Sequence, residues 1–234
     1  MLALRDLRPG AGWGVIDSLG RPKAPWYALK RVLAPVGLLL TDEGLNGLDL
    51  HVVNDTPSEL SGVVRVELFV RGELMVESEE QRVVVPGRSA TTIEVSGMFD
   101  GFRDLSGAYS FTPPAHDVVA ATFVADSGPD VPAVVHRPGG GIRPVESDLG
   151  LEAQVSRTDG GGWALEIATK RFAEWVVVEV PGYWPDDSWF HLPPGARRTL
   201  SLHPEVTHGS RQAPLSGEVR ALNCANSVRF AFPR

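Results

Sequence analysis

The sequence holds 234 residues, 43% of them apolar and 22% charged, which is typical of a globular protein that can bury a core in each of two domains. Its formal net charge of −7 at pH 7 argues against a nucleic-acid partner and against binding to an anionic membrane. Because no apolar run approaches the roughly 20 residues of a membrane-spanning helix, we expect a soluble chain with no membrane partner.

The first 35 residues are predicted to form a strand and then a helix. A short apolar run at residues 12–16 indicates the strand, and residues 17–20 supply turn chemistry after it. Pro25 suits the first turn of a helix, and Pro35 ends it. The large apolar residues of this helix fall on one face: Trp26, Leu29 and Leu33.

From residue 45 onward, apolar and polar residues alternate with the period of two that half-buried strands show. The candidate strands are separated by Gly, Pro, Asp and Ser clusters and lie at residues 48–53, 64–71, 81–85, 91–95, 108–111 and 118–124. This spacing is typical of a β-sandwich. We therefore predict a first immunoglobulin-like β-sandwich over residues 36–138.

The motif HRPGGGIRP, residues 136–144, holds three consecutive glycines between prolines, so it predicts a linker or an exposed turn. We place the domain boundary within it. The strand pattern then restarts, with candidates at residues 149–155, 163–168, 175–180, 199–202, 217–222 and 228–232. This second series predicts a second immunoglobulin-like β-sandwich over residues 139–234.

Three segments carry a family resemblance: PGAGWGVIDSLGRPKAPWYALKRVLAP (residues 9–35), GLNGLDLHVVNDTP (44–57) and WFHLPPG (189–195). The first resembles the junction in glycoside hydrolase family 2 enzymes of the β-mannosidase type, where the last strand and helix of a (β/α)8 catalytic barrel run into C-terminal β-sandwiches. The second is similar to the first strand after the barrel, and the third to a turn in the last sandwich. The sequence departs from the family pattern just before Pro9, where residues 2–8 lack the family's two tryptophans and its asparagine.

The resemblance implies a mainly β fold, with two tandem immunoglobulin-like β-sandwiches preceded by a short strand–helix remnant of a (β/α)8 barrel over residues 1–35. A whole barrel takes about 250 residues, so both catalytic glutamates of the family would lie upstream of Met1. We therefore assign no catalytic residue and expect no cofactor. The expected function is to brace the missing catalytic barrel of a parent enzyme that hydrolyses O-glycosidic bonds, terminal β-mannosides by resemblance.

The tryptophans are the candidates for carbohydrate binding. Trp184 and Trp189, in the segment YWPDDSWF, are the predicted platforms for a sugar ring, and the alternative function is a stand-alone carbohydrate-binding β-sandwich module that uses them. Trp163 and Trp175 fall inside strand patterns, so we expect both in the second core.

Other side chains suggest no further chemistry. Asp186 and Asp187 are expected to bind backbone amides in a turn. We expect no metal site, because His203 and His208 do not match a common zinc spacing. The single cysteine, Cys224, cannot form an internal disulfide. An adhesion protein built of immunoglobulin-like repeats would show a signal peptide and no leading strand and helix.

The N-terminal segment suggests which partners the chain has and where it is located. The apolar residues there need cover, which a barrel would supply; without one they would fold back on the first sandwich, stay exposed or form a homodimer through the helix. Arg5 and Arg8 are not followed by a long apolar segment, so we expect no signal peptide and a cytoplasmic location, although a fragment would carry no signal of its own. A glycan is the other expected partner.

Overall fold

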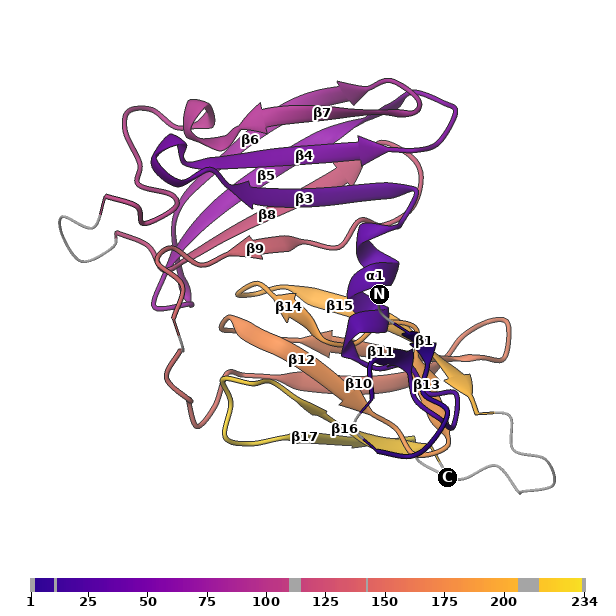
Figure 1. Cartoon of the computed structure of the whole chain (residues 1–234). Helices are drawn as coiled ribbons and strands as arrows, with labels where there is room; N and C mark the ends of the chain where they lie inside the picture. Colours follow the sequence, from indigo (N-terminus) through magenta and orange to yellow (C-terminus); the bar gives the residue numbers. More distant parts are fainter. Residues whose placement is uncertain (1–2, 11, 110–114, 142, 206–214, 233–234) are drawn as a thin grey trace. The chain divides into compact units, whose positions relative to one another are not determined.

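The computed structural model describes residues 3–10, 12–109, 115–141, 143–205 and 215–232. The fold is mainly β, as predicted, and the described residues contain seventeen strands, one α-helix and two short 3-10 helices. Contacts between residues divide the chain into two compact units: residues 31–143, and residues 1–30 together with 144–234. Each unit holds one β-sandwich (Figure 1). None of the described helices is long and apolar enough to cross a lipid bilayer.

The unit of residues 31–143 is a sandwich of a three-stranded and a four-stranded sheet. The first sheet has the order β3 (Val36–Asp42), β4 (Leu48–Asn54), β7 (Ser89–Glu94). The second has the order β6 (Leu74–Val85), β5 (Leu60–Val70), β8 (Val118–Ala125), β9 (Val134–His136). All pairs in both sheets are antiparallel. The predicted strand at 108–111 lies partly outside the described residues.

The period-two pattern of this unit creates its core. Along β4, every second side chain is buried, and Leu48, Leu50 and Val52 have no exposed surface. Along β5, Val64 and Val66 are equally inaccessible and belong to the same apolar cluster. Because alternate side chains point to opposite faces of a strand, one face of each sheet meets the other sheet and excludes water.

Asn54 is a polar anchor inside this core. It ends β4 and has no exposed surface. Its Nδ2 lies 2.8, 3.1 and 3.2 Å from the carbonyl oxygens of Ser58, Val85 and Pro86, and its Oδ1 accepts the Thr56 N–H at 3.1 Å. The side chain therefore satisfies the backbone where β4 turns away from the sheet, which explains why an asparagine ends the otherwise apolar buried face of this strand.

Two histidines of this unit, His116 and His136, are largely removed from water. Burial lowers the pKa of both rings. Surrounding charges make smaller contributions. The pKa of His116 is raised by Asp104, Glu77 and Asp117 and lowered by His136. The pKa of His136 is raised by Asp42 and lowered by Arg137. Both histidines are therefore favoured in their neutral forms when the unit is folded.

We expect this unit to lose stability as the pH falls below about 6.5, the pKa of a histidine in an unfolded chain. The folded-state pKa values of His116 and His136 lie below that value, so the unfolded state takes up protons first. The stability that the two neutral histidines contribute is complete above the pKa of the unfolded chain, and it is lost as the pH falls through their pKa values in the folded unit. Urea unfolding by circular dichroism from about pH 8 to 5 measures the loss. A His116→Phe, His136→Gln variant should show a shallower slope, and an unchanged slope would contradict the assignment.

The unit of residues 1–30 and 144–234 contains a second sandwich. Its first sheet has the order β10 (Glu152–Arg157), β11 (Trp163–Ala168), β15 (Arg197–Pro204), β13 (Tyr183–Pro185). Its second has the order β14 (Phe190–Leu192), β12 (Ala173–Glu179), β16 (Ser216–Arg220), β17 (Val228–Ala231). Side chains from both sheets share one apolar cluster, so the core lies between them.

The N-terminal segment belongs to this second unit rather than to the first sandwich. It forms β1 (Ala3–Arg5) and β2 (Gly14–Ile16), which pair in parallel, and then α1 (Ala24–Val32). The buried residue of α1 is Tyr27, whereas Leu29 and Leu33 of the predicted apolar face remain exposed. The face expected to be covered is thus largely open, and a tyrosine makes the contact instead.

Two hydrogen bonds attach α1 to the last residue of β13 and to the turn after it. The Tyr27 hydroxyl donates to the carbonyl of Pro185 at 3.4 Å, and Lys30 Nζ donates to the carbonyl of Asp186 at 2.6 Å. Burial, together with the charges of Asp187 and Asp186, raises the pKa of Tyr27 to about 12. The hydroxyl therefore keeps its proton and stays a donor over the physiological pH range.

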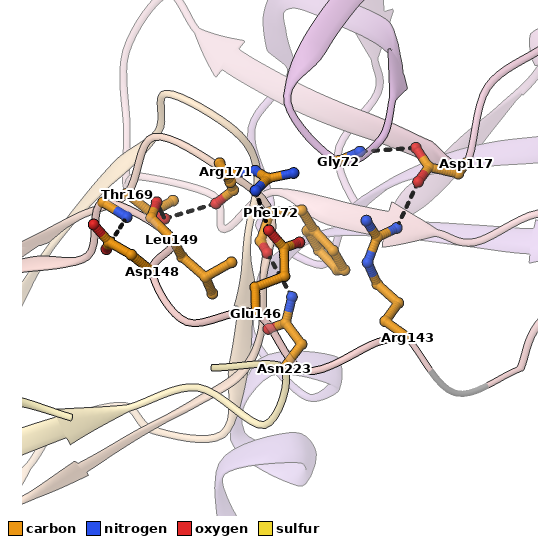
Figure 2. Close-up of polar contacts among 11 residues, drawn as sticks. Gly72, Asp117, Arg143, Glu146, Asp148, Leu149, Thr169, Arg171, Phe172 and Asn223 are labelled. Atoms are coloured by element: carbon orange, nitrogen blue, oxygen red, sulfur yellow. Dashed lines mark hydrogen bonds and ion pairs between the residues drawn. The ribbon is translucent and has the colours of Figure 1, made fainter. Parts of the chain in front are cut away.

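Each unit fixes its own end of the connecting segment. At the end of the first, Asp117 accepts the Gly72 N–H at 2.9 Å and binds Arg143 at 2.8 Å (Figure 2). At the start of the second, Glu146 forms an ion pair with Arg171, and its N–H donates to the carbonyl of Asn223 at 2.9 Å. The three glycines of the HRPGGGIRP motif, residues 139–141, lie outside any strand, as their composition predicts.

Candidate functional site

Trp175 lies at a β-bulge in β12 and points out of the core. β12 pairs with β14 through Ala173 opposite Leu192 and Val176 opposite Phe190, and the register shifts between the two pairs. Trp175 lies in this shift, with a left-handed backbone (φ +48°), and is 40% exposed. From Trp175 to Glu179, outward and buried side chains alternate regularly along β12, so Trp175 shares its outer face with Val177 and Glu179. The expectation that Trp175 belongs to the second core is therefore wrong, whereas Trp163 is half-buried and packs against that core.

Trp189 has the same unusual backbone. Its φ is +58°, and its N–H donates to the carbonyl of Val176 at 2.7 Å, next to the bulge. Its side chain is 38% exposed. For a bulky L-residue a positive φ is a genuine outlier that costs about 1–3 kcal/mol, so the surrounding strands hold both tryptophans in a strained conformation.

The two indole rings line one groove of about 550 Å³. We call it the tryptophan groove, and its lining residues are Ala24, Trp175, Val177, Glu179, Trp189, Arg220, Ala221 and Leu222. Most of these side chains are apolar, and the two charged ones, Glu179 and Arg220, form an ion pair with each other. Size and lining both match those of small-molecule sites, which are mostly apolar with a few polar groups.

His191 supports the Trp175 ring from one side. The ring centroids lie 4.4 Å apart with an interplanar angle of 52°, and the Trp175 N–H donates to His191 Nδ1 at 3.3 Å. His191 in turn contacts the buried ring of Phe172, with centroids 5.6 Å apart. This support fixes the orientation of the exposed indole, which lowers the entropic cost of binding anything to it.

Trp184, the other predicted platform, lies in the opposite sheet. It sits on β13 across from His203 of β15, and the two rings stack with centroids 4.3 Å apart and an interplanar angle of 26°. It does not line the tryptophan groove. The structure therefore brings Trp189 together with Trp175 rather than with Trp184. The sequence gives no signal for this pairing, because it depends on how β12 pairs with β14.

The adjacent carboxylates of YWPDDSWF bind backbone, as expected. Asp186 Oδ1 accepts the N–H of Ser201 at 3.0 Å, and Asp187 Oδ1 accepts the N–H of Ser188 at 2.7 Å. Asp187 also forms an ion pair with Arg198 and is only 6% exposed. These contacts give the two carboxylates structural roles in the turn between β13 and β14.

Within the described ranges, no group of three His, Cys, Asp or Glu side chains is arranged to hold a metal ion. His208, one of the histidines weighed for a zinc site, lies outside those ranges.

Comparison with known proteins places this geometry in a class. Residues 147–223 match the Ig_mannosidase family model, an Ig-fold domain. The chain is similar in structure to the β-D-mannosidase of Dictyoglomus thermophilum, with a TM-score of 0.73 and 14% identity over 95% of this chain and 26% of that one. It is also similar to the exo-β-D-glucosaminidase CsxA, with a TM-score of 0.66 and 14% identity over 99% of this chain and 30% of that one. No curated protein matches the sequence at a significant level.

These similarities define a protein built of immunoglobulin-like β-sandwiches that spans between a quarter and a third of the length of the two enzymes. They confirm the resemblance to the C-terminal region of glycoside hydrolase family 2 enzymes of the β-mannosidase type. Residues 147–223, which match the family model, have the Ig fold that this model describes.

Proposed function

We propose that this chain is the non-catalytic C-terminal β-sandwich region of a β-mannosidase-like glycoside hydrolase and that it braces the catalytic barrel. The reaction of the parent enzyme would be the hydrolysis of O-glycosidic bonds, those of terminal β-mannosides. The observation that carries the proposal is the N-terminal segment, in which α1 follows the parallel pair β1–β2 and several large apolar side chains remain uncovered.

A parallel pair of strands is unusual without neighbours. Parallel sheets occur almost only where helices cover both faces, and adjacent strands of a (β/α)8 barrel are parallel, each followed by a helix. β1 and β2 are parallel and α1 follows, yet all three residues of β1 are exposed. This segment is therefore suited to a place at the end of a barrel.

Large apolar side chains of the same segment face solvent. Six of them are more than half exposed: Leu4, Leu7, Trp13, Leu19, Val32 and Leu33. Exposed apolar surface of this extent marks an interaction site. A barrel packed on the segment would bury these side chains; in isolated chains, the same surface would support the homodimer that the sequence predicts.

The chemistry would come from the barrel. Retaining glycoside hydrolysis needs two carboxyl groups about 5 Å apart on a rigid scaffold, one as nucleophile and one as acid and base. The adjacent carboxylates of this chain, Asp186 and Asp187, are instead bound to backbone amides. The proposed contribution of the chain is therefore support for the barrel strands rather than a reacting group.

The test starts from the DNA on the 5′ side of the Met1 codon. We expect an in-frame (β/α)8 barrel with two glutamates at strand ends, and we expect the joined protein to hydrolyse 4-nitrophenyl β-D-mannoside. Deleting residues 3–234 from it should cause aggregation or loss of that activity. Hydrolysis by the purified 234-residue chain alone would contradict the proposal, and so would full activity of the barrel after the deletion.

A further inference from the structure

We propose that the tryptophan groove binds a neutral carbohydrate, with pyranose rings stacked on the exposed faces of Trp175 and Trp189. The groove follows from the structure, whereas the choice of a sugar among neutral ligands rests on the proposed function.

The backbone strain at both tryptophans argues that their exposed rings serve a purpose. In the described part of the chain, four non-glycine residues have a positive φ, and two of them are Trp175 and Trp189. Burial in a core does not explain the strained backbone of these two tryptophans, because each side chain is more than a third exposed. Glycine or asparagine would occupy such positions at lower cost. Strain of this kind clusters at ligand sites, where it orients the binding groups.

The shape of the groove suits a small ring-shaped ligand. Its volume of about 550 Å³ lies within the range of small-molecule sites, and its two indole faces present negative charge from the aromatic quadrupole. The axial C–H groups of a pyranose carry partial positive charge and form a flat apolar patch that matches an indole face. Val177, Ala221 and Leu222 extend the apolar lining, and Leu222 is 65% exposed.

The charges of the groove favour a neutral ligand. One carboxylate, Glu179, and one guanidinium, Arg220, line it and pair with each other, so their charges cancel. The groove therefore has no net positive charge that would attract a phosphate or a nucleotide. Both side chains are about half exposed, with relative accessibilities of 55% for Glu179 and 50% for Arg220. Their acceptors and donors can therefore reach the hydroxyl groups of a sugar bound between them.

The experiment uses the intact 234-residue chain and three probes: β-1,4-mannobiose, cellobiose and the acyclic polyol sorbitol. Saturation-transfer NMR reports contact with the sugar protons, and tryptophan fluorescence gives the affinity. We expect millimolar binding of at least one disaccharide and none of sorbitol, because an open-chain polyol has no rigid face to stack. Trp175→Ala and Trp189→Ala should each weaken binding about tenfold or more.

Trp184→Ala is the matched control, because it removes an aromatic side chain of the same unit outside the groove. It should leave the affinity unchanged. If an alanine variant at Trp175 or Trp189 does not fold, Leu222→Glu replaces it, since an exposed side chain tolerates the change and the added charge should weaken binding.

Three results would overturn the proposal: no binding of either disaccharide at its solubility limit, binding that survives both groove substitutions, or binding of sorbitol as tight as that of the disaccharides. The groove could instead be covered by a protein surface. If the groove substitutions weaken association with the barrel while no sugar binds, the sugar proposal fails and the bracing function stands. If a disaccharide binds as expected but no barrel is encoded upstream, the bracing function fails and the sugar site stands.

Discussion

Arg198→Ala is expected to lower the free energy of unfolding of the second sandwich by about 3 kcal/mol. The guanidinium forms an ion pair with Asp187, whose side chain is 9% exposed, while that of Arg198 is 19% exposed. The guanidinium carbon also lies 4.4 Å from the centroid of the Phe190 ring. Removing one partner of a buried pair is costly because the other charge has already been taken out of water.

Arg197 provides a matched control in the adjacent position of β15. It pairs with Glu166 at 3.0 Å, but the two side chains are 71% and 42% exposed. Arg197→Ala should therefore cost less than about 1 kcal/mol. Urea unfolding followed by tryptophan fluorescence measures both, since all six tryptophans lie in this unit. Equal losses for the two variants would contradict the distinction between the buried and the exposed pair.

Asn223→Ala is expected to lower the same free energy by about 2–3 kcal/mol. Asn223 is 1% exposed, and its Oδ1 accepts the Glu174 N–H at 2.8 Å. Its Nδ2 donates to the Phe172 carbonyl at 2.9 Å (Figure 2). Both bonds hold the start of β12, just before the bulge that carries Trp175. The substitution removes both bonds and leaves a small cavity, and each of these changes has a cost inside a packed core.

The control for this prediction is Asn226→Ala. Asn226 Nδ2 also donates to a backbone carbonyl, that of Ser147 at 2.7 Å, but at an exposed site. Water replaces such a bond, so the loss should stay within about 0.5 kcal/mol. The same fluorescence-detected unfolding compares the two variants. A loss for Asn226→Ala as large as that for Asn223→Ala would show that burial is not the cause.

The long strands could be predicted from the sequence because one side of each is buried. In β4 and β11 the alternation of apolar and polar residues is regular enough to give their positions to within a residue. Short strands were missed. β13 and β14 have three residues each, too few to show a period, and they lie where the segment YWPDDSWF predicts only a turn. β1 was also missed, because all of its residues are exposed.

The candidate site was half predictable. An exposed Trp189 could be proposed because it follows a Pro-Asp-Asp-Ser turn outside any strand pattern. Trp175 could not, since the sequence EWVVVEV reads as a continuous buried strand and does not show which of its faces is exposed. In the structure, Trp175 and Val177 are on the outer face of β12, and Val176 is on the buried one. Likewise, nothing in the helical pattern of residues 24–33 singles out Tyr27, whose contact with Pro185 joins positions far apart in the chain.

The sequence by itself determined that this chain is mainly β, that its strands form two series separated by a glycine-rich segment, and that it resembles the end of a family 2 glycoside hydrolase. These properties are local, since burial on one face of a strand dictates a period that any short window reveals. Only the tertiary structure decided which sandwich holds the N-terminal segment, and which two tryptophans share a groove. Both depend on contacts between residues distant in sequence, where a one-residue shift in strand pairing reverses the direction in which a side chain points.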